Sequence, residues 1–170
     1  RRWDDEGYPP VPVSVNVSRA DIYHADIADI MMRTVSKYGL TPSRLHLEIT
    51  ESAYTEDPGQ IIETVSHLRE LGFVIEMDDF GSGYSSLNML NQMPIDILKL
   101  DMTFIRSETA KPADQGVLQF IMELARRMHL SVVAEGVETK EQLELLKAYG
   151  CTTIQGYYYS KPVEVEQFSV

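Results

Sequence analysis

Residues 73–83 read FVIEMDDFGSG, and this stretch says most about the fold of the chain. Its first six residues, 73–78, are mainly apolar and predict a strand. Asp78 and Asp79 stand where that strand ends, and a Gly-Ser-Gly loop follows them. Such a loop lets the backbone approach a ligand closely, so the stretch is typical of a strand that leads into a functional site.

The same organisation recurs on both sides of this stretch. We predict six strands, at residues 13–17, 45–50, 73–78, 96–101, 131–135 and 152–157. Amphipathic helices are predicted between them, at residues 21–38, 58–71, 86–91, 114–128 and 139–149, the last with Thr139 and Gln142 placed for a capping box.

Strands that alternate with helices indicate a parallel sheet. The sheet could close as an open doubly wound sheet or as a (β/α)8 barrel. No Gly-rich dinucleotide-binding turn follows the first strand, which weakens the doubly wound alternative. The expected fold class is therefore α/β, a TIM-type barrel that is incomplete, with about six of its eight strands.

Polar side chains stand at or near the carboxyl end of every predicted strand, and their neighbours within the strands are apolar. They are Asn16, Glu48, Asp78, Asp79, Lys99, Asp101, Glu135 and Gln155. Because side chains alternate between the two faces of a strand, these polar groups are expected to share one face. In a barrel they would converge at the mouth where the strands end, which is where barrel enzymes place catalysis.

Four of these residues are carboxylates, namely Glu48, Asp78, Asp79 and Glu135. Burying like charges together is costly unless a cation compensates them. Oxygen ligands favour Mg²⁺ or Mn²⁺ over zinc, and adjacent carboxylates can divide two ions between them. Two ions about 4 Å apart form the clamp used in phosphoester hydrolysis, and Lys99 beside them could hold a water or a phosphate oxygen.

Each of these motifs taken alone has an ordinary structural explanation, such as a helix cap or a solvated turn. Their repetition at the same end of successive strands favours a site. The formal net charge of −11 argues against binding a nucleic-acid polymer. A single cysteine, Cys151, fits a reducing cytoplasm and a core position, and the four histidines share no zinc-ligand spacing. No apolar run is long enough to cross a membrane, so we expect no membrane contact by this segment.

Taken together, the motifs resemble those of the EAL family of cyclic di-GMP phosphodiesterases, in the family's order and over essentially the whole chain. The residues that carry the resemblance are Asn16-Val17-Ser18, Leu47 to Glu51, Asp78 to Ser86, Lys99-Leu100-Asp101, Glu135 to Glu138 and Gln155-Gly156-Tyr157.

The resemblance implies a barrel that hydrolyses cyclic di-GMP to linear pGpG with Mg²⁺ or Mn²⁺ at a two-metal site. It implies that Asn16, Glu48, Asp78 and Asp79 bind metal. Lys99 would position or deprotonate the attacking water, and Glu135 would support the network of metal and water. Asp101, Gln155 and Gly156 are expected to contact the substrate. Glu51 would anchor the loop from Asp79 to Ser86.

Two departures from the family pattern bear on the expected domain. Ser82 stands where the family commonly has Thr, with the hydroxyl kept. The Glu-Ala-Leu signature is absent, so we expect residues 1–170 to be the last three quarters of the domain, without its first two strands. This chain alone is then expected to have little or no activity.

The resemblance also implies partners. We expect a homodimer formed near the Asp79–Ser86 loop and an upstream GGDEF or sensor domain in a cytoplasmic parent protein, which missing N-terminal segments could tether to a membrane. Two alternatives stay open. One is an inactive EAL domain that serves as a cyclic di-GMP receptor; the other is a barrel enzyme of different chemistry, such as a metal-assisted lyase.

Overall fold

The computed structural model describes residues 1–54, 58–81, 87–101, 103, 116–164 and 167–168. Its strands form one parallel sheet in which every strand pairs with its sequence neighbour, in the order β1 to β6. The strands are β1 (Val13–Asn16), β2 (Leu45–Thr50), β3 (Val74–Phe80), β4 (Ile97–Leu100), β5 (Ser131–Ala134) and β6 (Thr153–Ile154).

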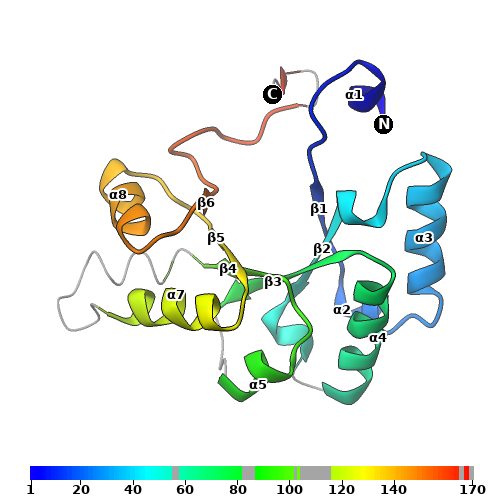
Figure 1. The fold of residues 1–170 in the computed structure, drawn as a ribbon, viewed down its shortest axis with the longest axis horizontal. Coiled ribbons are helices and arrows are strands. Elements are labelled where there is room, and N and C mark those ends of the chain that lie inside the picture. The colour runs from blue at the N-terminus through cyan, green and yellow to red at the C-terminus, as the bar shows by residue number, and fades with distance from the viewer. Residues whose placement is uncertain (55–57, 82–86, 102, 104–115, 165–166, 169–170) are drawn as a thin grey trace.

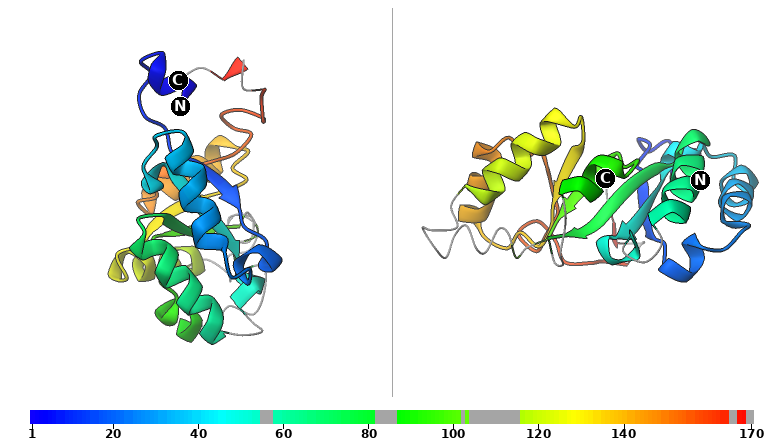
Figure 2. Two further views of the ribbon diagram at one scale, coloured as in Figure 1. Left: turned by 90° about the vertical axis from the view of Figure 1, so that its right-hand side faces the viewer. Right: turned by 90° about the horizontal axis from the view of Figure 1, so that it is seen from below.

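Helices lie along one side of the sheet (Figure 1). They are α2 (Arg19–Ile22), α3 (Ile27–Lys37), α4 (Pro58–Glu70), α5 (Leu87–Gln92), α7 (Val117–Arg127) and α8 (Lys140–Ala148), with the 3-10 turns η1 (Pro42–Arg44) and η2 (Glu51–Tyr54). The short helix α1 (Arg2–Asp5) lies apart from them, beyond the amino end of β1 (Figure 1). The views from the side and from below show that the sheet curves away from these helices (Figure 2). Six parallel strands therefore form a half-barrel, with the helices outside.

The core lies between the outer face of the sheet and the helices. Leu47 and Ile49 of β2 and Ile75 and Met77 of β3 are fully buried on that face. Glu48, which lies between Leu47 and Ile49, must then face inward, because successive side chains of a strand point to opposite faces. The alternation expected from the sequence thus holds in the central strands.

Three elements differ from the sequence-based prediction. The helix expected over residues 21–38 is split into α2 and α3, because the backbone N–H of Asp26 bonds to the ring of His24 and not to a helical carbonyl. Strand β3 continues two residues beyond Asp78. Strand β6 is only two residues long, since the chain turns at Gly156 against the backbone of Val137. The capping box of Thr139 and Gln142 is confirmed.

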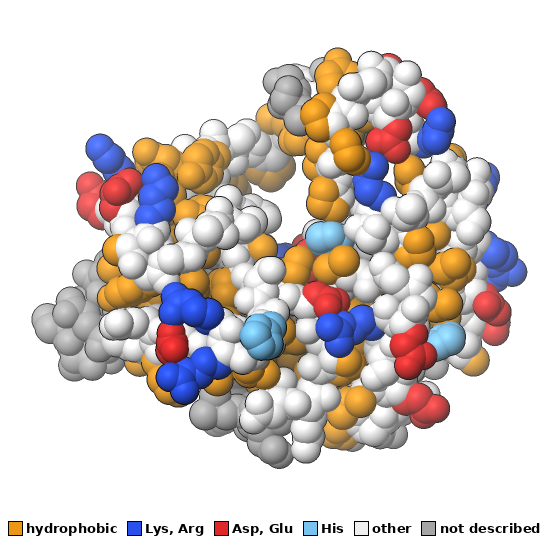
Figure 3. Space-filling model, in the orientation of Figure 1, with side chains coloured by type: hydrophobic (Ala, Val, Ile, Leu, Met, Phe, Trp, Pro, Cys, Tyr) orange, Lys and Arg blue, Asp and Glu red, His pale blue; other side chains and the backbone are white. Residues whose placement is uncertain are grey.

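After β6 the described part of the C-terminal segment returns toward the N-terminal helix α1 (Figure 1). Trp3 stacks on Phe168 with ring centroids 5.1 Å apart. Between the two edge strands the surface is hollowed (Figure 3). A cavity of about 760 Å³ lies there, against the inner face of the half-barrel. No helix in the described part of the chain combines the length and apolarity needed to cross a bilayer.

Candidate active site

Three carboxylates from three different strand ends surround the ammonium group of Lys99. Lys99 Nζ lies 2.7 Å from Glu48 Oε1 and 2.9 Å from Glu135 Oε1. Asp78 Oδ1 lies 3.1 Å from the same nitrogen. Only 6% of the Lys99 side chain is exposed. We call these four residues the Lys99 cluster.

The parallel register explains why residues so far apart in sequence meet. Glu48 of β2 is aligned with Asn16 of β1, while Asp78 of β3 lies two residues further along, opposite Thr50. Lys99 of β4 reaches Asp78 on the neighbouring strand β3 and Glu48 on β2, one strand further away. Glu135 directly follows β5, where its backbone N–H bonds to the carbonyl of Leu100 at the end of β4. The cluster therefore sits at the carboxyl ends of β2 to β5.

The electrostatics of the cluster favour a charged Lys99. Burial alone would disfavour the ammonium, but its hydrogen bonds to Glu48 and Glu135 outweigh burial and leave the pKa of Lys99 raised. Burial raises the pKa of Glu135, against the opposing effect of Lys99. Three carboxylates thus face one ammonium, which leaves an excess of negative charge.

Asp79 lies beside this excess charge in an unusual conformation. Its φ of 55° is in the left-handed region, and the pairing of β3 with β4 is irregular between Met77 and Phe80. An irregularity of this kind re-aims a side chain away from the regular alternation of a strand. Burial raises the pKa of Asp79, and the negative charges of Asp78 and Asp101 raise it further.

Glu51 is buried immediately after β2, and its Oε2 accepts a hydrogen bond of 2.9 Å from the backbone N–H of Gly81. This contact ties η2 to the chain just after β3, where the predicted loop begins. Residues 82–86 of that loop, including Ser82, lie outside the described residues. The anchoring role of Glu51 therefore stays a prediction, and the bond to Gly81 supports it.

The remaining predicted residues lie near the cluster without joining it. Asn16 is exposed beside Glu48, and Gln155 is exposed at the end of β6, where it lines the large cavity. Asp101 accepts a 2.7 Å hydrogen bond from the backbone N–H of Thr103. Gly156 has a structural explanation, because a Cβ there would lie 2.2 Å from the Val137 carbonyl oxygen. Their substrate and metal contacts stay predictions.

The donor set of the cluster suits a hard cation. All its acceptors are carboxylate oxygens, and Asp78 Oδ1 is buried without a hydrogen bond of good geometry, although the ammonium is close. In the described part of the chain, however, no three His, Cys, Asp or Glu side chains are arranged to hold a metal ion. The residues fit a divalent cation by chemistry and charge, provided that the carboxylates release Lys99.

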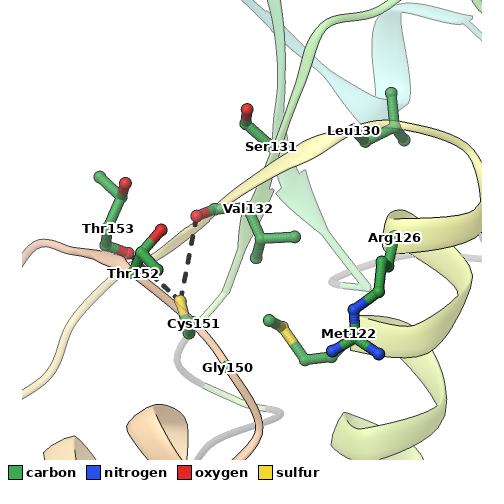
Figure 4. Close-up of a pocket in the computed structure, with 9 residues that line it drawn as sticks. All are labelled: Met122, Arg126, Leu130, Ser131, Val132, Gly150, Cys151, Thr152 and Thr153. Atoms are coloured by element: carbon green, nitrogen blue, oxygen red, sulfur yellow. Dashed lines mark hydrogen bonds between the residues drawn. The ribbon is translucent and has the colours of Figure 1, made fainter.

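Another, smaller cavity lies at the opposite ends of β5 and β6, and no residue of the Lys99 cluster lines it (Figure 4). Its volume is about 190 Å³, and it is lined by Met122 and Arg126 of α7 and by Cys151. Cys151 is buried, and its thiol contacts the carbonyl oxygens of Val132 and Thr153. Burial raises the pKa of this thiol, so Cys151 suits the core position expected for it and not a nucleophilic role.

Two polar residues on the inner face were missed by the sequence reasoning. His46 Nδ1 lies 2.6 Å from Glu76 Oε1, and Glu76 is buried. The signal was available, because His46 precedes Glu48 by two residues and Glu76 precedes Asp78 by two. The strand period of two places His46 on the same face as Glu48 and Glu76 on the same face as Asp78.

Comparisons of the sequence and of the structure with known proteins point to one family. The sequence profile of the EAL domain matches residues 1–162. The cyclic di-GMP phosphodiesterase NbdA of Pseudomonas aeruginosa is 40% identical over 157 residues, which are 92% of this chain and 20% of NbdA. The chain thus spans about a fifth of the length of the first curated relatives it matches.

Solved structures agree with this assignment. The phosphodiesterase PaMucR in complex with c-di-GMP is 36% identical, with a TM-score of 0.90 over 98% of this chain and 67% of that chain. BlrP1 of Klebsiella pneumoniae, solved with manganese and c-di-GMP, is 28% identical, with a TM-score of 0.82 over 89% of this chain and 39% of that chain.

The likeness to PaMucR confirms the expected fold class, because the six parallel strands superpose on an EAL structure over nearly all of this chain. Because the profile matches almost the whole of this chain, residues 1–162, the chain belongs to the EAL domain family.

Proposed function

We propose that this chain carries the catalytic face of a metal-dependent phosphodiesterase that hydrolyses cyclic di-GMP to linear pGpG. The observation that carries the proposal is the Lys99 cluster, in which three carboxylates from separate strand ends meet around one ammonium. Membership of the EAL family supplies the substrate class, since the relatives NbdA and PaMucR are named as phosphodiesterases of this nucleotide.

Asn16, Glu48, Asp78 and Asp79 would hold Mg²⁺ or Mn²⁺, with Asp78 and Asp79 shared between two ions. What supports this set is the alignment of Asn16 with Glu48 and the excess negative charge around Asp78 and Asp79. Bound ions would activate water and stabilise the charge that develops on the phosphate. The BlrP1 structure, which was solved with manganese, supports the proposal of a divalent ion at this site.

Hydrolysis requires a water oxygen to bond to phosphorus while the P–O bond to the 3′ oxygen breaks and that oxygen takes up a proton. Lys99 suits the positioning of the water or a phosphate oxygen, because its raised pKa keeps the ammonium charged. The same shift argues against Lys99 as the base. Glu135 is better suited than Lys99 to accept the proton that the attacking water gives up, because burial raises the pKa of Glu135.

Asp101, Gln155 and Gly156 remain proposed substrate contacts. The cavity beside Lys99 and Glu48 is lined by Gln155 and Gly156 as well, which supports their placement near a bound nucleotide. The homodimer, the GGDEF or sensor domain, the cytoplasmic location and the low activity of residues 1–170 alone stay predictions. So does the assignment of residues 1–170 as the last three quarters of the domain.

The proposal is tested by two measurements with one matched pair of variants. Isothermal titration of this chain with Mn²⁺ reports binding, and conversion of cyclic di-GMP is assayed on the longest natural protein that carries these residues. Glu48→Gln should abolish both binding and turnover. Glu144→Gln, on the exposed side of α8, is the control and should change neither. Full turnover by Glu48→Gln would disprove the assignment, and binding of cyclic di-GMP without hydrolysis would favour the receptor alternative.

A further inference from the structure

The inner face of the half-barrel carries a fourth carboxylate beside the Lys99 cluster, and this one is buried. Glu76 of β3 is aligned with Glu48 of β2 and precedes Asp78 by two residues. Glu76 and Lys99 line the same cavity, and only 5% of the Glu76 side chain is exposed. Position alone would therefore make Glu76 a candidate to join the cluster.

Glu76 instead turns toward the amino end of β2, where its Oε1 lies 2.6 Å from His46 Nδ1. The three close ion pairs of Lys99 are with other carboxylates, those of Glu48, Asp78 and Glu135. A buried carboxylate without a partner is strongly destabilising. His46 supplies that partner for Glu76, and Lys99, which lines the same cavity, is the cation that Glu76 could turn to if His46 were removed.

We propose that His46 is a positioning residue that holds the Glu76 carboxylate out of the Lys99 cluster. Two consequences follow for the site. The cluster keeps three carboxylates and not four, so its excess of negative charge is limited. Lys99 also stays bonded to Glu48 and Asp78, the residues that a divalent cation would take over. Where it concerns metal binding, this inference rests on the proposed function.

Loss of His46 would release Glu76 toward Lys99. Glu76 would then either draw the ammonium away from Glu48 and Asp78 or add its own charge to the site. Both routes leave more negative charge available to a cation, and ligand charge sets the affinity of oxygen-ligand sites. We therefore expect the His46→Leu variant to bind Mn²⁺ about tenfold more tightly, because one more negative charge at an oxygen-ligand site raises its affinity.

The test is a double-mutant cycle of His46→Leu, Glu76→Leu and the double variant, each measured in two ways. The first readout is the midpoint of urea unfolding in EDTA. His46→Leu should lower the midpoint, and the added Glu76→Leu should restore it, because a buried pair can be replaced by apolar side chains at little cost. The second readout is the Mn²⁺ dissociation constant by calorimetry, which should return to within about twofold of wild type in the double variant.

The outcomes separate this proposal from a purely structural role. Weaker Mn²⁺ binding by His46→Leu, or no recovery in the double variant, would overturn it. Additive losses in the unfolding midpoint would overturn it as well, because they would mean that the two residues do not depend on each other. If wild type binds no Mn²⁺, the proposed metal-dependent function fails, and the unfolding cycle still decides the pairing.

Discussion

Replacing Lys99 by Met removes the positive charge from a buried cluster while keeping most of the side-chain volume. Glu48, Asp78 and Glu135 would then face one another without their common partner. Removing one member of a buried ion pair costs about 3–5 kcal/mol. In a chain of this size that corresponds to a fall in the melting temperature of about 6–20 °C.

The assay is thermal and urea unfolding in EDTA, with Lys147→Met as the matched control. Lys147 pairs with Glu144 on an exposed face of α8, so its replacement should cost less than about 1 kcal/mol. The measurement is then repeated with Mn²⁺. At a hundredfold excess over the dissociation constant, a bound ion adds about 2.7 kcal/mol of stability.

We expect Mn²⁺ to stabilise Lys99→Met more than wild type, since the variant has no ammonium competing for Glu48 and Asp78. Turnover should be lost, because the group proposed to position the water is gone. If Lys99→Met were within about 1 kcal/mol of wild type in EDTA, the cluster would not be held by this charge. The reasoning about the site would then be wrong.

Three further predictions concern residues around the cluster. Gly156→Ala should lower stability by about 1–3 kcal/mol in urea unfolding, because its Cβ would overlap the backbone of Val137; an unchanged midpoint would contradict the close approach. Asp79→Asn should raise the melting temperature slightly at pH 7 in EDTA. The raised pKa of Asp79 means that its ionisation opposes folding as pH rises, so the gain should vanish below about pH 4, where both states are protonated; a gain that persisted there would refute this cause. Glu51→Ala should cost about 1–3 kcal/mol and reduce turnover, because it leaves the N–H of Gly81 without its acceptor; turnover at the wild-type level would argue against the anchoring role.

The sequence was sufficient for most of the fold. Strand β2 is found at the predicted residues, and the capping box of Thr139 begins α8 as expected. These features are local, because the strand period and helix capping depend on residues a few positions apart. The helix over residues 21–38 was predicted wrongly because the chain breaks where the backbone N–H of Asp26 donates to the ring of His24, which apolar spacing does not encode.

The polar strand ends were equally visible in the sequence, and parallel pairing alone brings Glu48, Asp78 and Glu135 to one end of the sheet. What only the tertiary structure decided is which charges pair. Register and strand curvature set whether Lys99 meets all three carboxylates and whether Glu76 turns to His46. Those choices depend on distances of a few ångströms between strands, and at that range the interaction of buried charges changes steeply.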